Sequence, residues 1–160
     1  MRIIEGSRPA GGLKFAVVVS KYNDFVTDRL QRGALAALTH LGVRDDDITV
    51  IRVPGAFEIP TAARLAADTN EFDGIVCLGC LIRGATPHFE YISSAVAHGL
   101  TAASSATGIP MAFGVLTTNS AEEALERAVD GPSNKGWEAA QATVEMAIIA
   151  GELAGSASTT

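Results

Sequence analysis

The sequence is poor in cysteine, in charge and in aromatic residues. Its 160 residues include two cysteines, too few for the disulfide framework of a small secreted domain. Charged residues make up 19% and hydrophobic residues 48%, and this balance excludes an intrinsically disordered chain. The formal charge of −6 argues against a nucleic-acid partner, which would require a basic surface. An anionic substrate would therefore depend on local positive groups.

Apolar runs of the kind that form membrane segments or targeting signals are missing as well. The first six residues have no apolar core after Arg2, so we expect no signal peptide. Residues 91–121 contain no Lys, Arg, Asp or Glu, but Gly108 and Pro110 interrupt them. We interpret this stretch as buried helix, loop and strand. We accordingly expect no membrane partner and a cytoplasmic location.

Apolar segments rich in β-branched residues alternate with longer alanine-rich segments along the chain. The length fits one domain, which we expect over residues 13–154, between an N-terminal tail or edge strand (1–12) and a flexible C-terminal tail (155–160). We predict strands at 13–20, 48–53, 74–79 and 111–116, a short edge strand at 3–4, and helices at 25–41, 59–67, 89–106, 120–128 and 135–153.

Strands that are apolar on both faces and separated by helices are typical of a parallel sheet covered on both sides. Right-handed crossovers then predict an α/β fold of three α/β/α layers, a flavodoxin-like, doubly wound parallel sheet of four core strands with an N-terminal edge strand. Such sheets bind ligands at the carboxyl ends of their strands. The candidate site therefore comprises the loops at 21–24, 54–58, 80–88 and 117–119.

Two of the predicted helices carry too little charge for the surface of a monomer. The helix at 89–106 has Glu90 as its one formal charge, and the helix at 135–153 spaces its glutamates seven residues apart among apolar residues. A helix with so little polar surface is buried on most sides. We therefore expect contacts between subunits, with the helix at 89–106 lining one of them.

Residues 79–91 form the segment richest in chemical groups. The segment leaves a predicted strand, turns through Arg83 and Gly84, and enters a helix for which Thr86 is a candidate N-cap and Pro87 suits the first position. The amides near residues 84–86 would then form an anion site at the positive end of the helix. The alternative interpretation is a capped helix start without a ligand.

His88 lies in the first turn of this helix, where the helix dipole disfavours the charged imidazolium. A neutral imidazole beside a bound phosphate could accept and return a proton. The alternative is a histidine that only hydrogen-bonds the loop. The other two histidines fit structural roles, His40 at a helix C-terminus and His98 as a buried imidazole.

A second group of candidates follows the other strands. Phe57 could stack on a ring and Glu58 could accept hydrogen bonds from hydroxyl groups, while Gly55 lets a ligand approach the backbone. Tyr22 and Asn23 add another aromatic ring and an amide. The alternative interpretation is that the aromatic rings pack in the core and that Glu58 favours a helix start.

Arg127, Lys135 and Phe113 are harder to place. The helix at 120–128 starts at the carboxyl edge of the sheet and runs back, so we expect Arg127 at the opposite edge, and Phe113 lies early in its strand. These residues could serve the site of a neighbouring subunit. The alternative is that Arg127 and Lys135 are merely solvated.

Cys77 and Cys80 form a C-x-x-C pattern, but in a strand they would stand about 10 Å apart, too far for a disulfide. No further cysteine and histidine set completes a zinc site. We expect neither a redox role nor a metal site.

Several motifs follow one another along the chain, namely PGAFEIP at 54–60, IRGATPHFEY at 82–91, GVLTT at 114–118, Arg127 and NKG at 134–136. Together they resemble the 6,7-dimethyl-8-ribityllumazine synthase family, and the resemblance covers residues 13 to about 153. It implies a transferase of riboflavin biosynthesis that condenses 5-amino-6-(D-ribitylamino)uracil with 3,4-dihydroxy-2-butanone 4-phosphate, without a cofactor or metal. It also implies a homopentamer with active sites between adjacent subunits and, as a further partner, riboflavin synthase.

The resemblance also implies roles for individual residues. His88 moves protons, and the phosphate is held by Ala85, Thr86 and Arg127. The ribitylaminouracil is held by Tyr22, Asn23, Ala56, Phe57, Glu58, Cys80, Leu81, Ile82, Phe113 and Lys135, partly through backbone groups.

Three departures from the family pattern bear on stacking and assembly. Tyr22 stands where Phe or Trp is common, which preserves stacking. Residues 129–133 differ from the loop of relatives that form icosahedral shells, and Pro9 interrupts the N-terminal tail, so assembly beyond a pentamer stays open. Two other functions are compatible with the same fold, that of a flavin-binding electron carrier and that of a structural shell protein. Neither function requires His88, Arg127 and the aromatic residues together.

Overall fold

A single parallel sheet organises the chain. The structure is a computed structural model that describes residues 1–158. Four strands pair in the order β2-β1-β3-β4, with bounds Phe15–Ser20 (β1), Ile48–Val53 (β2), Gly74–Ile82 (β3) and Met111–Thr118 (β4). All pairings are parallel. The prediction of a doubly wound sheet of four core strands is confirmed.

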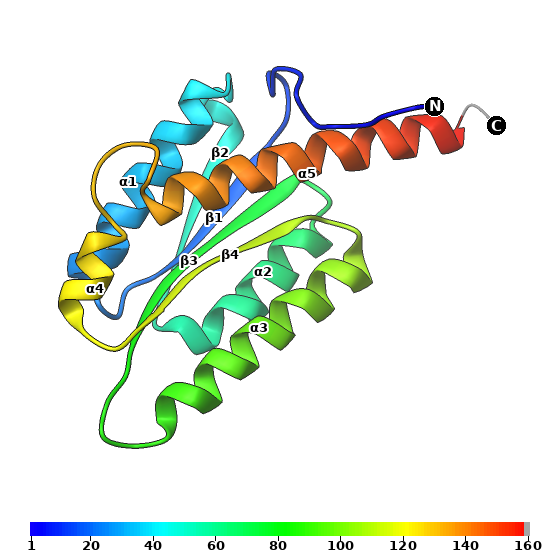
Figure 1. The fold of residues 1–160 in the computed structure, drawn as a ribbon. Helices are drawn as coiled ribbons and strands as arrows, with labels where there is room; N and C mark the ends of the chain where they lie inside the picture. The colour runs from blue at the N-terminus through cyan, green and yellow to red at the C-terminus, as the bar shows by residue number, and fades with distance from the viewer. Residues whose placement is uncertain (159–160) are drawn as a thin grey trace.

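Helices cover both faces of this sheet (Figure 1). Helices α1 (Asp24–His40) and α5 (Lys135–Ser158) pack on one face, and α2 (Ile59–Asp68) and α3 (His88–Thr107) pack on the other. The short helix α4 (Ala121–Glu126) follows β4, and single 3-10 turns lie at Asp45–Asp47 and Ala56–Glu58. None of the described helices is both long and apolar enough to span a membrane.

Alternate residues of the central strands enter two separate cores. Val17 and Val19 of β1 face α1 and α5, whereas Ala16 and Val18 face α2 and α3. The side-chain period of a strand is two, so a strand covered on both faces must be apolar at every position. This is why the runs of β-branched residues allowed the strands to be predicted.

The predicted N-terminal edge strand is wrong. Residues 3–4 lie in no strand, and the N-terminal tail instead follows the outer side of α5 (Figure 1). Gly6 is buried there, and a Cβ at that position would lie 2.9 Å from the Cα of Glu145. The backbone of the tail approaches the helix so closely that it is held away from the edge of the sheet.

Several element ends differ from the prediction. β3 runs three residues further, to Ile82, and β4 two further, to Thr118, because these added residues pair with one another. α4 is shorter than expected, and α5 continues through residues 155–158, which were expected to form a tail. The rest of that expected tail, residues 159–160, lies outside the described residues.

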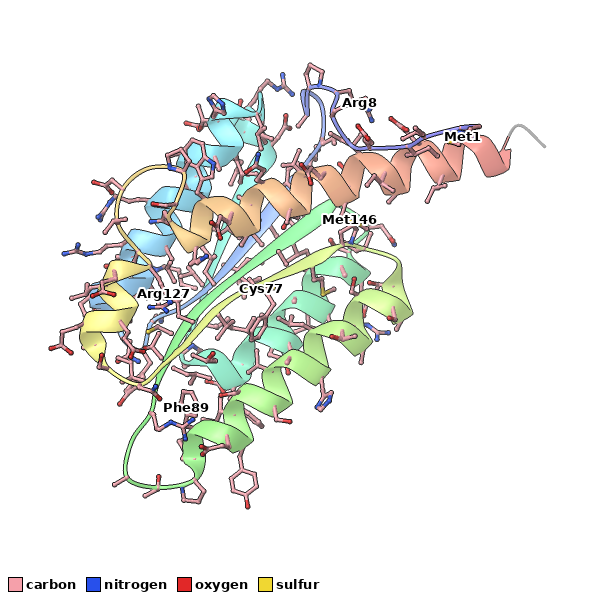
Figure 2. The ribbon with its side chains drawn as sticks, in the orientation of Figure 1. Met1, Arg8, Cys77, Phe89, Arg127 and Met146 are labelled. Carbon is pink, nitrogen blue, oxygen red and sulfur yellow. The ribbon has the colours of Figure 1, made fainter. Side chains whose placement is uncertain are left out.

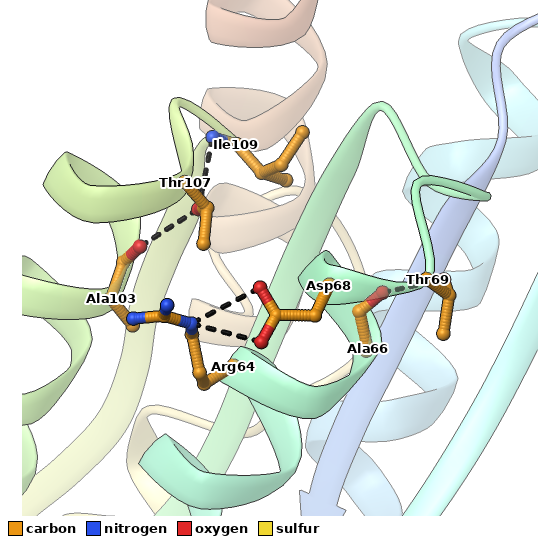
Figure 3. A network of polar contacts seen from close by, with 7 residues as sticks. All are labelled: Arg64, Ala66, Asp68, Thr69, Ala103, Thr107 and Ile109. Atoms are coloured by element: carbon orange, nitrogen blue, oxygen red, sulfur yellow. Dashed lines mark hydrogen bonds and ion pairs between the residues drawn. The ribbon is translucent and has the colours of Figure 1, made fainter.

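Polar contacts lie near the C-terminal ends of α2 and α3 (Figure 3). The Nε of Arg64 donates to both carboxylate oxygens of Asp68 at 3.1 Å. The hydroxyl of Thr107 donates to the carbonyl of Ala103 at 2.7 Å and accepts from the amide of Ile109 at 3.2 Å. These hydrogen bonds stabilise the C-terminal ends of the two helices, which lie on the side of the sheet opposite the predicted site.

The start of α5 is fixed on α1 by Asn134, which is fully buried. Its Oδ1 accepts hydrogen bonds from the amides of Gly136 at 2.7 Å and Trp137 at 3.2 Å, and its Nδ2 donates to the carbonyl of Arg29 at 3.2 Å. The two helices approach closely here, since a Cβ at Gly136 would lie 2.0 Å from the carbonyl oxygen of Leu30. This junction sets the position of Lys135.

We expect the substitution Gly136→Ala to lower the free energy of unfolding by about 1–3 kcal/mol, because the added methyl group must push α1 and α5 apart. Urea unfolding at a fixed protein concentration measures this change. Gly11→Ala is the matched control, since its nearest neighbour would be the carbonyl oxygen of Gly42 at 3.8 Å, an ordinary contact. Equal stability of the two variants would contradict the tight helix approach.

Candidate functional site

A hollow of about 910 Å³ opens at the carboxyl ends of β1, β2 and β3. It is lined by ten of the residues predicted for the site, namely Tyr22, Asn23, Ala56, Phe57, Glu58, Cys80, Leu81, Ile82, Thr86 and His88. These residues come from three segments that are far apart in the sequence, each at or just after the end of a strand. The sheet brings them together because parallel strands end at the same edge.

Two aromatic rings stand at this hollow without being part of the core. Tyr22 is 72% exposed and Phe57 is 62% exposed. The alternative interpretation, in which Phe57 packs in the core, is therefore wrong. Exposed rings beside a hollow offer flat apolar surfaces on which a planar ligand can stack.

Asn23 joins the first loop to the end of β3. Its backbone is left-handed, with φ of 64°, and its Nδ2 donates to the carbonyl oxygen of Cys80 at 2.9 Å. The pairing of β1 with β3 ends at Val19 and Leu78, so residues 80–82 of β3 pair with β4 alone. Backbone groups on the other side of β3 therefore face the hollow.

Gly55 leaves room for Glu58. Its φ of −147° is ordinary extended backbone, so the conformation itself does not require glycine. A Cβ at this position would lie 3.3 Å from Oε1 of Glu58, a tighter contact than most side chains make. The glycine thus permits the carboxylate of Glu58 to lie over the turn at the edge of the hollow.

The loop before α3 is open to solvent. Thr86 does not act as the N-cap, because α3 begins at His88 with Pro87 in the cap position and no side chain caps it. Among residues 1–158, no carbonyl or side chain accepts a hydrogen bond from the amides of residues 84–86. These amides therefore point to an anion site, as the dipole of α3 also favours.

His88 and Ala85 complete this loop. Both are exposed, and the imidazole of His88 makes no hydrogen bond to any other described residue. The alternative of a histidine that only braces the loop is not what the structure shows. His98, expected to be buried, is exposed further along α3, with its Nδ1 3.4 Å from Oγ of Ser94.

A second hollow, of about 470 Å³, lies between β4 and α5. Phe113, Arg127 and Lys135 line it, and none of them lines the first hollow. Figure 2 shows Phe89 at the start of α3 and Arg127 at the end of α4, at separate places on the molecule. One chain therefore presents the predicted site residues as two separate sets.

The expectation that Arg127 lies at the opposite edge of the sheet is wrong. α4 has six residues, about 9 Å of helix, and cannot run back along the whole of β4. The guanidinium of Arg127 donates to the carbonyl of Glu123 at 3.0 Å, and its own carbonyl accepts from the amide of Lys135 at 2.9 Å. The side chain of Lys135 pairs with Glu138 at 2.8 Å.

Some residues at the first hollow were not predicted from the sequence. Phe89, Tyr91 and Ile92 belong to α3 and line the same space as His88. Ile92 follows His88 by four residues, so it lies on the same face of the helix. That spacing is the signal that could have identified it.

Cys77 and Cys80 lie in different cores. Cys77 packs with α2 and α3, whereas Cys80 packs with α1 and α5, and both are free thiols. Residues three apart in a strand point to opposite faces, which separates the two sulfur atoms. The described residues contain no group of three or more His, Cys, Asp or Glu side chains arranged to hold a metal ion.

Comparisons with known proteins show the family of the chain. A family model described as 6,7-dimethyl-8-ribityllumazine synthase matches residues 12–150. A protein of Syntrophus aciditrophicus (strain SB) named 6,7-dimethyl-8-ribityllumazine synthase is 52% identical over 144 residues, which cover 90% of this chain and 94% of that protein.

The two thiols should resist alkylation in the folded protein. Burial raises the pKa of Cys77 to about 12 and that of Cys80 to about 11, so both stay protonated near pH 8. Iodoacetamide at pH 8 should add to neither cysteine in the native protein and to both in urea, as measured by mass spectrometry. Rapid labelling of the native protein would contradict this burial.

The same burial makes the free energy of unfolding depend on pH. Because the pKa of each thiol is higher in the folded state, the protonated thiols contribute fully to stability below about pH 9, and this contribution is lost as the pH rises toward 11.

Proposed function

The chain belongs to the 6,7-dimethyl-8-ribityllumazine synthase family, and from that premise we propose how its residues carry out the family's reaction. The reaction condenses 5-amino-6-(D-ribitylamino)uracil with 3,4-dihydroxy-2-butanone 4-phosphate, and releases phosphate and water. It is a transferase reaction of riboflavin biosynthesis. We assign these roles on one observation. Aromatic rings that can stack on a ligand and backbone amides that lack a hydrogen-bond acceptor lie at the same hollow.

The first hollow binds the ribitylaminouracil. Tyr22 and Phe57 stack on its ring, and Glu58 accepts hydrogen bonds from its hydroxyl groups. The side of β3 that β1 leaves unpaired offers further donors and acceptors from the backbone of Cys80 and Ile82. Leu81 lines the same hollow, with its backbone groups turned toward β4. Ala56 and Asn23 complete this set, Asn23 through its Oδ1 and through the Nδ2 hydrogen that is not donated to Cys80.

The loop before α3 binds the phosphate of the second substrate. The amides of Ala85 and Thr86 and the positive end of α3 attract it. His88, which is exposed and makes no hydrogen bond to the described chain, takes and returns protons during the condensation.

The residues of the second hollow serve the first hollow of an adjacent subunit. Phe113 adds a further ring, Arg127 a charge for the phosphate, and Lys135 a nearby cation. The separation of the two hollows within one chain supports this division. The sparsely charged surface of α3, of which only Val96, Leu100 and Ala103 are buried in the chain, supports contacts between subunits, and membership of the family leads us to propose a homopentamer.

The chemistry requires positioning more than reactive side chains. The amine of the uracil attacks the ketone and forms an imine between the substrates with loss of water, phosphate then leaves, and the ring closes with loss of further water. No step requires a cofactor. Holding the two reactants in the correct orientation lowers the activation free energy by several kcal/mol. A proton shuttle such as His88 raises the rate by a further factor of roughly 10² to 10⁴.

We further propose a cytoplasmic enzyme whose product passes to riboflavin synthase. The flavin carrier and the shell protein are not favoured, because neither requires an unpartnered histidine beside an anion site. Formation of 6,7-dimethyl-8-ribityllumazine from the two substrates, followed by absorbance and fluorescence, is the direct test of the activity.

His88→Ala should lower kcat about tenfold or more and leave the fold intact, since the variant loses only proton transfer. Some turnover should remain, because the bound substrates are still held together. Steady-state rates at saturating substrates give kcat, and circular dichroism checks the fold. An unchanged kcat would remove His88 from the mechanism.

Mixed oligomers of Arg127→Ala and His88→Ala chains should regain activity. In a randomised equal mixture, about a quarter of the interfaces would combine an intact His88 from one chain with an intact Arg127 from its neighbour. Subunits are dissociated, mixed and reassembled, and the rate is compared with that of each parent treated identically.

The matched control mixes His88→Ala with a chain that carries both substitutions, because no interface then contains His88. Recovery in the first mixture and none in the second is the expected pattern. If verified mixed oligomers show only the average of their parents, both residues serve the site of the same chain and the proposed division is wrong.

A further inference from the structure

Arg83 joins three segments at the edge of the first hollow. Its amide donates to the carbonyl of Thr118 at 2.8 Å, and its Nε donates to Oδ1 of Asn119 at 3.0 Å. Its guanidinium pairs with Glu90 and lies 4.6 Å over the ring of Phe89. Arg83 thus connects the ends of β3 and β4 to the first turn of α3, although no role described above uses it.

The carboxylate of Glu90 is a negative charge close to the candidate anion site. It lies in the first turn of α3, where the helix dipole attracts a carboxylate. The same turn carries His88 and follows the open amides of residues 84–86. One turn of helix rises about 5.4 Å, so an unpaired Glu90 would place a negative charge within reach of any anion bound there.

Resting on the phosphate site of the proposed function, we propose that Arg83 is a positioning residue that neutralises Glu90 and keeps its carboxylate away from the phosphate of the butanone substrate. The guanidinium is held on its other side by Asn119 and Phe89, so it stays at Glu90 rather than moving toward the ligand. The anion then meets the helix dipole and the amides without a competing negative charge.

The ion pair is about half exposed on both sides, so its loss should not unfold the protein. For the same reason its electrostatic effect on a nearby anion should weaken as salt is added. These two properties separate a role in anion binding from a role in folding.

The test compares Arg83→Gln, Glu90→Gln and the double variant in the whole enzyme. Arg83→Gln should raise KM for the butanone phosphate about fivefold or more at low salt, with kcat at saturation little changed. Inorganic phosphate should lose a similar factor as a competitive inhibitor. Adding Glu90→Gln to the same chain should restore most of both values, and Arg83→Lys should stay near the parent.

The pair of Arg64 and Asp68 provides a matched control (Figure 3). Its side chains are 49% and 54% exposed, against 48% and 53% for Arg83 and Glu90, and it lies at the other edge of the sheet. Arg64→Gln should leave KM unchanged. Size-exclusion chromatography of every variant checks that the assembly is the same.

Three results would overturn the proposal: an unchanged KM in Arg83→Gln, a fall in kcat alone, or no recovery in the double variant. The last result would mean that the guanidinium itself contacts phosphate. Failure of the proposed function is distinct from all three, since it would appear in the parent enzyme, as absence of lumazine formation or of competition by inorganic phosphate.

Discussion

The extension of β3 beyond β1 is the constraint on which the candidate site depends. β3 pairs with β1 only as far as Leu78 but continues beside β4 to Ile82. Its last three residues are thus held straight by one neighbour while their other side faces a hollow. A rigid strand with unpaired backbone groups can recognise polar ligand atoms at little conformational cost. The bond from Asn23 to Cys80 joins the neighbouring loop to this strand, and the amides of Lys21 and Tyr22 join the same loop to the carbonyls of Val53 and Pro54.

Most of the sheet was predictable because short runs rich in apolar and β-branched residues alternate along the chain with longer alanine-rich segments. The boundaries of β2 match the prediction at both ends. What escaped prediction depends on contacts between distant segments. The N-terminal tail packs on α5 through the backbone of Gly6, and no periodicity in its sequence reveals a helix that lies almost 140 residues away. Thr86 fits a capping position by type, but the loop is shaped by Arg83 reaching Thr118 and Asn119.

The candidate site was predictable to the extent that residues follow strands directly. Tyr22, Phe57 and His88 lie where the end of a parallel strand must place them. Arg127 was located less well, because its position depends on how soon α4 ends, and neighbouring alanine and leucine residues do not mark that end. The separation of Arg127 from the first hollow was inferred from chain direction, but for the wrong reason, because α4 ends early and the second hollow lies between β4 and α5.

Helix α3 buries three residues within its own chain, yet no Lys, Arg, Asp or Glu follows Glu90 along it. In the proposed pentamer its neighbours cover this surface, but a newly synthesised chain exposes it until they are found. During that interval the helix, and the unpaired edge of β4, are open to unrelated chains as well as to correct ones. The speed of subunit encounter in the cell, rather than the speed of sheet formation, then determines how much of the new protein escapes aggregation.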